Sequence, residues 1–236
     1  MLIRLFMIIH GALCPAFAKR RGFGLDEALA RGLSGLFAGK SVGDFGAGFG
    51  RYVEEIRKYG QVSSIVGYDG MPDVEKSSKG LVRRVDFTSE VGSGIPVFDW
   101  VLSLDVGEHI PPEKEDVFIT NVCSHSREGA VVSWAESGRG GHVITRMSEL
   151  WSLDLDPSET ESLRMSAGFK HFKKAVMLFK KRTETGALPE SWDSASTLPA
   201  TFWCSEECAW FLNPELVSGF RLYYSLFPRD ISGGVS

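Results

Sequence analysis

Cysteine is scarce in this chain: four occur among 236 residues, and no Cys-x-x-Cys pair is present. Cysteines this few and this scattered exclude a disulfide framework. Cys204 and Cys208 stand about one helical turn apart, a spacing that does not match a zinc knuckle. We therefore expect neither a disulfide scaffold nor a bound metal ion.

A strong net charge is also absent, since the formal net charge is −4. Such a chain has no general field that attracts nucleic acid, and the basic stretch 170–182 is expected to be a solvated strand face. No internal repeat occurs. With 43% hydrophobic and 24% charged residues, the chain can bury a core of ordinary size. These values predict one globular domain with extensions.

No apolar run is long enough to span a bilayer as a helix. Residues 1–18 contain one basic residue, an apolar core and an Ala16-Phe17-Ala18 ending that is typical of a signal-peptidase site. Three interpretations stay open. A signal peptide would direct the protein to the secretory pathway. The segment could instead be an anchor that is never cut, with membrane contact, or a buried N-terminal helix of a cytoplasmic protein.

A glycine-rich loop is the feature around which the rest of the sequence is organised. A short apolar run ends at Asp44, glycines recur at Gly46, Gly48 and Gly50, and helical apolar spacing follows over 51–59. Glycines let the backbone approach a ligand closely, and a helix N-terminus presents unpaired N–H groups. The pattern predicts a strand, a ligand-binding loop and a helix.

The spacing of these glycines distinguishes between cofactors. A dinucleotide-binding G-x-G-x-x-G pattern would require glycine where Arg51 stands. The D-x-G-x-G-x-G pattern instead resembles motif I of the class I S-adenosylmethionine-dependent methyltransferases. The resemblance covers residues 25–182 and implies an α/β, Rossmann-like fold. In that family a mostly parallel, seven-stranded sheet has its last strand antiparallel and helices on both faces.

Further cofactor residues are expected at the ends of later strands. Asp69 ends a predicted strand over 63–69, 19 residues after Gly50, where a carboxylate can bind ribose hydroxyls. The resemblance implies that Asp86 and Phe87, near the end of a strand over 81–88, contact adenine. Asp105 follows the strand predicted over 97–104. The predicted cofactor site comprises Asp44, Gly46, Gly48, Gly50, Asp69, Asp86, Phe87 and Asp105.

The acceptor of the methyl group is expected near the next two loops at the same edge of the sheet. Glu108-His109-Ile110 resembles a segment common in small-molecule methyltransferases, and the N/D-P-P-Y segment of nucleic-acid amino-methyltransferases is absent. A second loop over 135–143, after a strand over 129–134, contains His142. His109 and His142 are the candidate catalytic residues, as base or hydrogen-bond partner, with loop anchoring as the alternative.

Helices are also predicted over 25–37, after Pro111-Pro112, and over 147–151 and 157–165, followed by two closing strands over 168–172 and 174–182. The domain prediction is thus 1–18, a methyltransferase domain over 19–182, and an extension over 183–236. Within the extension, 201–227 is rich in aromatic residues and would cap the pocket, pack on the sheet, or meet an interface or membrane surface.

The predicted activity is methyl transfer to an oxygen or nitrogen of a small molecule, whose identity the sequence leaves open along with the oligomeric state. Two other functions remain. An NAD-dependent oxidoreductase is disfavoured by the glycine spacing and by the lack of a Tyr-x-x-x-Lys pair. A protein that binds the cofactor without catalysis has the same cofactor motifs.

Overall fold

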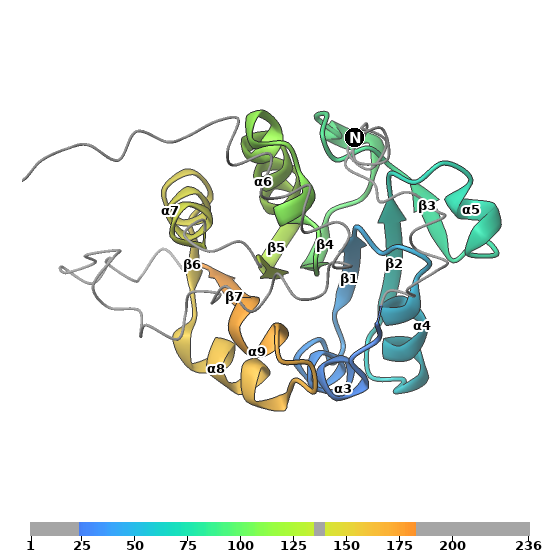
Figure 1. Ribbon diagram of the computed structural model, residues 1–236, viewed down its shortest axis with the longest axis horizontal. Helices are drawn as coiled ribbons and strands as arrows, with labels where there is room; N and C mark the ends of the chain where they lie inside the picture. The colour runs from blue at the N-terminus through green and yellow to red at the C-terminus, as the bar shows by residue number, and fades with distance from the viewer. Residues whose placement is uncertain (1–23, 135–139, 183–236) are drawn as a thin grey trace, which may run out of the picture.

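A seven-stranded sheet forms the centre of the computed structural model, which describes residues 24–134 and 140–182 (Figure 1). The strand order is β3-β2-β1-β4-β5-β7-β6. Strands β1 to β5 are parallel, and β7 runs antiparallel to both of its neighbours. The strands are β1 (Ser41–Phe45), β2 (Ser64–Asp69), β3 (Val82–Arg84), β4 (Phe98–Ser103), β5 (Ser126–Ser133), β6 (Leu153–Leu155) and β7 (Val176–Lys181).

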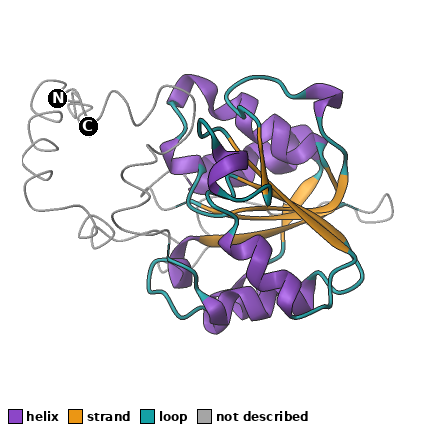
Figure 2. Ribbon diagram, turned by 90° about the vertical axis from the view of Figure 1, so that its right-hand side faces the viewer, coloured by secondary structure: helices purple, strands orange, loops and turns teal. Residues whose placement is uncertain are grey.

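Helices cover both faces of this sheet (Figure 2). In Figure 1, α6 and α7 lie on one side, whereas α3, α4, α8 and α9 lie on the other. The helices that the structure describes are α3 (Glu27–Leu36), α4 (Arg51–Lys58), α5 (Val74–Ser77), α6 (Glu115–Ser124), α7 (Gly140–Trp151), α8 (Pro157–Ser166) and α9 (Phe172–Ala175). In the same part of the chain, short 3-10 turns occur at Gly92–Gly94, Gly107–His109 and Pro112–Lys114. The predicted α/β, Rossmann-like architecture is confirmed.

Alternation along the central strands divides the core into two layers. On β4, Val101 packs in the layer beneath α6 and α7, whereas Trp100 and Leu102 pack in the layer beneath α3, α4 and α8. All three side chains are buried. Both faces of a central parallel strand must be apolar when helices cover both, which explains the continuous apolar run in this strand.

The strand order reverses between β1 and β4. From β1 the chain crosses over to β2 and then β3 on one side, and it returns to place β4 on the other side of β1. The loops that leave the carboxyl ends of β1 and β4 therefore diverge and leave a crevice, where ligands bind in open α/β sheets. The hydroxyl of Ser103 joins the two strand ends by donating to the Phe45 carbonyl at 2.7 Å.

Two predicted elements are wrong. The segment 168–172, predicted as a strand, is a turn that leads into α9, and the sixth strand is Leu153–Leu155 instead. Asp26 explains the turn, because its carboxylate accepts hydrogen bonds from the backbone N–H groups of Gly168 and Phe169 at 3.0 and 2.7 Å. These two N–H groups are bonded to a side chain rather than to a neighbouring strand.

Helix α7 also differs from expectation, since it begins at Gly140, inside the loop predicted over 135–143. Its apolar residues Val143, Ile144 and Met147 are buried in the core beneath α6 and α7. This burial outweighs the low helix propensity of the two glycines in its first turn.

The predictions for residues 1–18 and 183–236 lie outside the described residues. Among the residues that the structure describes, no helix is both long and apolar enough to cross a membrane.

Candidate functional site

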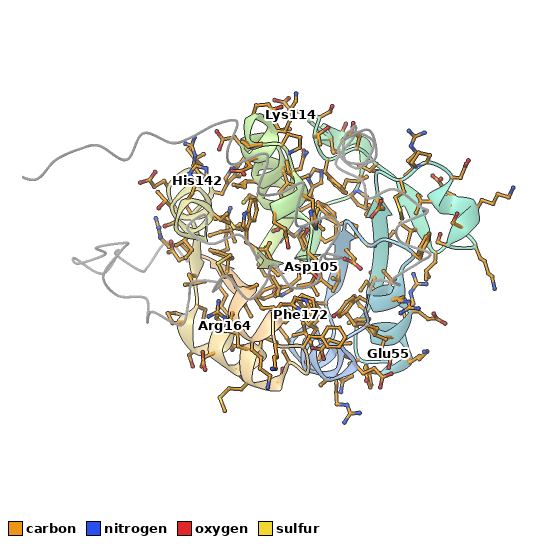
Figure 3. The ribbon with its side chains drawn as sticks, viewed as in Figure 1. Glu55, Asp105, Lys114, His142, Arg164 and Phe172 are labelled. Atoms are coloured by element: carbon orange, nitrogen blue, oxygen red, sulfur yellow. The ribbon has the colours of Figure 1, made fainter. Side chains whose placement is uncertain are left out.

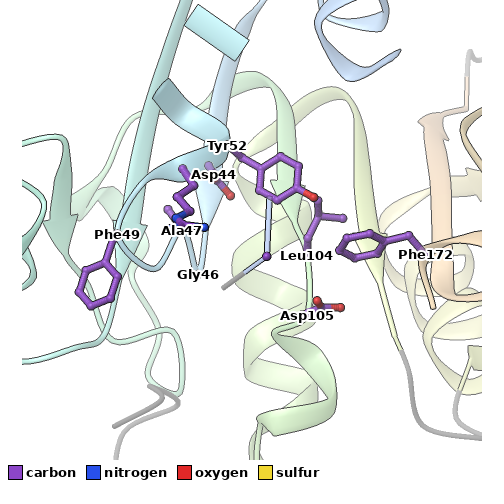
Figure 4. Close-up of a pocket in the computed structure, with 10 residues that line it drawn as sticks. Asp44, Gly46, Ala47, Phe49, Tyr52, Leu104, Asp105 and Phe172 are labelled. Atoms are coloured by element: carbon purple, nitrogen blue, oxygen red, sulfur yellow. The ribbon is translucent and has the colours of Figure 1, made fainter. Parts of the chain in front are cut away.

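A pocket opens at the carboxyl ends of β1 and β4, at the reversal of strand order (Figure 4). Residues from the glycine loop and the first turn of α4 form one wall, and residues after β4 and from α9 form the other. The lining residues are Gly24, Asp44, Gly46, Ala47, Phe49, Arg51, Tyr52, Leu104, Asp105 and Phe172. The pocket thus includes the predicted residues Asp44, Gly46 and Asp105.

The glycine loop makes a sharp turn between β1 and α4. Gly46, Gly48 and Gly50 all have positive φ, a region that side-chain-bearing residues disfavour. A Cβ on Gly46 would lie 2.2 Å from Cγ2 of Val106, so the backbone here passes directly against the loop after β4. The loop is fixed to β2, because the N–H groups of Gly46 and Ala47 donate to the Tyr68 carbonyl at 2.8 and 2.9 Å.

Asp44 places a buried carboxyl group at the pocket wall. Its side chain is 4% exposed, and no hydrogen bond joins it to another residue in the described part of the chain. Burial, with a smaller contribution from the charge of Asp69, raises the pKa of Asp44 to about 8. A carboxyl group in this state is suited to pairing with a cationic ligand.

Asp69 lies behind the loop rather than among the pocket-lining residues. One carboxylate oxygen accepts from the Gly48 N–H at 2.8 Å, and the other accepts from the Met71 N–H at 2.9 Å. Burial raises its pKa, an effect that these two hydrogen bonds oppose. Because two carboxylate oxygens offer about four acceptor positions, Asp69 can still accept two further hydrogen bonds.

Asp105 is held from two sides at the end of β4. Its N–H donates to the hydroxyl of Ser133 at 2.7 Å, and that hydroxyl lies 3.2 Å from Oδ1 of Asp105. The other oxygen, Oδ2, lies 3.2 Å from Nε2 of His171. Asp105 also has a φ of 55°, which is unusual outside glycine and occurs here at the pocket wall.

Tyr52 brings a phenol into the pocket from the first turn of α4 (Figure 4). Its oxygen accepts a hydrogen bond from the Asp26 N–H at 3.2 Å. Burial raises the pKa of Tyr52, and the charges of Asp26, Asp105 and Asp44 add to this shift. The phenol is thus protonated near neutral pH, and within the described residues its own hydrogen is donated to no other group.

The predicted adenine-contacting residues lie after β3. Asp86 accepts hydrogen bonds from the backbone and hydroxyl of Thr88 at 2.9 and 2.7 Å. The Phe87 ring is buried and stacks on Phe45 with ring centroids 4.4 Å apart. Neither residue lines the pocket.

The two candidate catalytic histidines also lie outside the pocket lining. His109 ends the 3-10 turn after β4 and is exposed. His142 lies on α7 with its Nε2 4.0 Å from Oε2 of Glu115, and Figure 3 shows it well away from Asp105. The histidine that the fold brings to the pocket is His171, through Asp105.

Several residues of the site were not predicted. Tyr52 has an apolar position in the helical pattern, and Phe172 lies in a segment predicted as a strand. His171 and Ser133 meet Asp105 from sequence separations of 66 and 28 residues. The position of Tyr52 directly after the glycine loop was a usable signal, whereas nothing local marks the other three. Among the described residues, no cluster of three His, Cys, Asp or Glu side chains is placed to hold a metal ion.

The family models and the curated proteins contain no match to this chain. Solved structures do match it. A TehB-like SAM-dependent methyltransferase from Corynebacterium glutamicum has a TM-score of 0.51 at 18% identity, over 71% of this chain and 94% of its own. The magnesium protoporphyrin IX methyltransferase of Synechocystis, crystallised with SAM, has a TM-score of 0.53 at 12% identity, over 77% of this chain and 96% of its own.

These likenesses establish the fold. It is the Rossmann-like fold of the class I S-adenosylmethionine-dependent methyltransferases, as the glycine spacing predicted. This is the fold that the predicted methyltransferase class implies.

Proposed function

We propose that this chain is an S-adenosylmethionine-dependent methyltransferase that methylates an oxygen or nitrogen atom of a small molecule. The observation that carries the proposal is the buried carboxyl group of Asp44, which lines the pocket beside the glycine loop without a cationic partner among the described residues. A ligand that brings a positive charge to this position would offset the cost of ionising Asp44.

The pocket residues fit such a cofactor. S-adenosylmethionine supplies an electrophilic methyl group on a sulfonium centre and carries an α-ammonium group. Asp44 would bind the ammonium group, and the glycine loop can pass directly against Val106 at Gly46 because glycine has no Cβ. Asp69 would bind the ribose hydroxyls with its remaining acceptor positions. Asp86 and Phe87 remain the predicted contacts of adenine.

Catalysis would rest mainly on alignment. The chain's task is to hold the acceptor in line with the methyl group and the sulfur and to exclude water from the pocket. An amine or hydroxyl acceptor must also lose a proton, which requires an acceptor for that proton nearby. The small-molecule class of acceptor rests on the Glu108-His109-Ile110 segment. Two structures with which this chain shares its fold are described as a TehB-like SAM-dependent methyltransferase and a magnesium protoporphyrin IX methyltransferase.

Calorimetry with S-adenosylhomocysteine and NAD tests cofactor binding directly. We expect binding of S-adenosylhomocysteine only, and a loss of about tenfold or more for Asp69→Ala, since a hydrogen bond to a charged group contributes about 1.5–3 kcal/mol. The same substitution at the exposed Asp116 on α6, Asp116→Ala, is the matched control. Tight binding of NAD without binding of S-adenosylhomocysteine would show the proposal to be wrong.

A second assay distinguishes an enzyme from a protein that only binds the cofactor. S-adenosylmethionine with a deuterated methyl group is incubated with defined pools of amines, phenols, alcohols, thioethers and pyridines, and products are detected by their mass shift. We expect labelled products from the amine or hydroxyl pools. Cofactor binding with no transfer to any pool would favour the non-catalytic alternative.

A further inference from the structure

The two pocket carboxylates have different surroundings. Asp44 is buried beside the glycine loop and has no hydrogen-bond partner among the described residues, whereas Asp105 is held by Ser133 and His171. Asp105 is also the more accessible of the two, with 36% of its side chain exposed. A carboxylate that is held in place and yet accessible is suited to contact substrate molecules that enter and leave the pocket.

Asp105 shares its wall of the pocket with Phe172, and Tyr52 belongs to the facing wall with the glycine loop (Figure 4). The charges of Asp105 and Asp44 both act on the Tyr52 hydroxyl, so this hydroxyl lies within electrostatic range of both carboxyl groups. The Phe172 ring adds an apolar surface beside Asp105. The pocket around Asp105 therefore combines an anionic acceptor and an aromatic surface with a hydroxyl donor on the facing wall.

From this division we propose that Asp105 belongs to the acceptor subsite and receives a hydrogen bond from the N–H or O–H group that is methylated. The inference rests on the proposed methyltransferase function. It moves Asp105 from the cofactor set predicted from the sequence to the opposite side of the transferable methyl group, with Ser133 and His171 as positioning residues. The substrate class is a nucleophile that bears a proton, an amine or a hydroxyl compound, rather than a thioether or a pyridine.

In this transfer the acceptor gains the methyl group and loses its proton. The acceptor's lone pair forms a bond to the methyl carbon while the carbon–sulfur bond breaks, and that bond's electron pair returns to sulfur to give a neutral thioether. The acceptor's proton passes to the Asp105 carboxylate. His171 and Ser133, on the two carboxylate oxygens, fix the direction from which Asp105 meets that proton.

Sinefungin tests this assignment without knowledge of the acceptor. In this analogue a carbon bearing an amino group replaces the sulfur and its methyl, so a cationic amine occupies the position of the transferred group. We expect Asp105→Asn to weaken sinefungin binding about tenfold, since a charge-assisted hydrogen bond is lost. Binding of S-adenosylhomocysteine, which has nothing at that position, should change by less than about twofold.

Three further variants give the experiment its controls. Asp116→Asn makes the same substitution on the exposed surface of α6 and should leave both affinities unchanged. Asp44→Asn should weaken both ligands together, because both carry the α-ammonium group. His171→Gln should lower the preference for sinefungin by a smaller factor, about threefold, and it keeps the test available if Asp105→Asn does not fold.

The outcomes separate the inference from the function on which it rests. If Asp105→Asn or, in its place, His171→Gln leaves the preference for sinefungin unchanged, Asp105 does not face the transferred group and the inference is overturned. An equal loss of both ligands would place Asp105 in the cofactor site, which also overturns it. Failure of the wild-type protein to bind S-adenosylhomocysteine would instead reject the proposed function.

Discussion

Asp44 links ligand binding to a proton. Its pKa of about 8 in the folded protein lies above that of an unfolded aspartate, about 3.9. Between these values the native state binds more protons than the unfolded state. The free energy of unfolding of the free protein should therefore fall as the pH rises from about 4 to about 8. A cationic ligand beside Asp44 would lower the pKa of this carboxyl group and so favour its ionised form.

The first prediction is that S-adenosylhomocysteine binding releases about one proton near pH 7. The affinity should rise with pH and level off above about 8, where Asp44 is already ionised. Calorimetry in buffers of different ionisation enthalpy measures the released proton. Asp44→Asn should abolish most of the release. A wild-type protein that binds without a change in protonation would show that Asp44 is not the group that meets the ligand's charge.

Two glycines allow the stability cost of a positive φ to be measured separately from the cost of a steric clash. Gly46 and Gly39 both have positive φ, at 85° and 73°, but a Cβ would meet Val106 only at Gly46 and would meet nothing within 4 Å at Gly39. Gly39→Ala should cost about 1–2 kcal/mol of stability through its φ alone. Gly46→Ala should cost about 1–3 kcal/mol more through the clash.

Urea denaturation gives the two stabilities, and S-adenosylhomocysteine binding gives the second readout. We expect Gly39→Ala to bind normally and Gly46→Ala to bind at least about tenfold more weakly, because its clash displaces the loop. Equal stability losses in the two variants would mean that the approach to Val106 does not constrain this loop.

At the scale of elements, Asp26 joins three parts of the chain. Its carboxylate caps α3 by accepting from Leu29 N–H at 3.0 Å, and it also accepts the N–H groups of Gly168 and Phe169. Its own N–H donates to Tyr52. This buried side chain therefore connects α3, the turn before α9 and the pocket-lining helix α4.

Asp26→Ala should destabilise the fold by about 2–4 kcal/mol, more than an ordinary cap, because three N–H groups lose their acceptor. The control is Asp156→Ala at the N-terminus of α8, where the carboxylate accepts a capping hydrogen bond from Glu159 N–H and forms a surface ion pair with Lys180. That variant should lose about 1 kcal/mol. Chemical denaturation compares them, and equal losses would contradict a connecting role for Asp26.

The sequence pattern predicted the elements whose packing is determined by the spacing of their own apolar residues and glycines. Glycine spacing and apolar periodicity identified β1, α4, β2 and β4, and Asp44, Gly46 and Asp105 at the pocket followed from the ends of those strands. The prediction of a strand over 168–172 was wrong because the Gly168 N–H donates to the carboxylate of Asp26, which lies more than 140 residues away in the sequence. The strand Leu153–Leu155, which pairs with β7, is three residues long, and this is too short for an alternation to be recognised.

At the scale of the whole molecule, the pocket-lining residues that the structure describes lie between Gly24 and Phe172. The described strands of the sheet and the helices on its two faces lie within residues 24–182. A chain of residues 19–182 keeps every one of these groups, and it retains Gly24 at the pocket when the candidate signal peptide 1–18 is removed. This part of the chain should therefore suffice for cofactor binding.

The last prediction compares residues 19–236 with residues 19–182. Both should unfold cooperatively and bind S-adenosylhomocysteine with affinities within about threefold of each other, because every lining residue that the structure describes is kept. Asp44→Asn in the shorter chain is the control for specific binding. A loss of tenfold or more on removal of 183–236 would contradict this prediction and favour the alternative in which the aromatic segment caps the pocket. Methyl transfer to the same defined pools is then measured for both chains. If residues 183–236 bind the acceptor, their removal should lower methyl transfer and leave S-adenosylhomocysteine affinity unchanged. If they bind the cofactor, their removal should lower both.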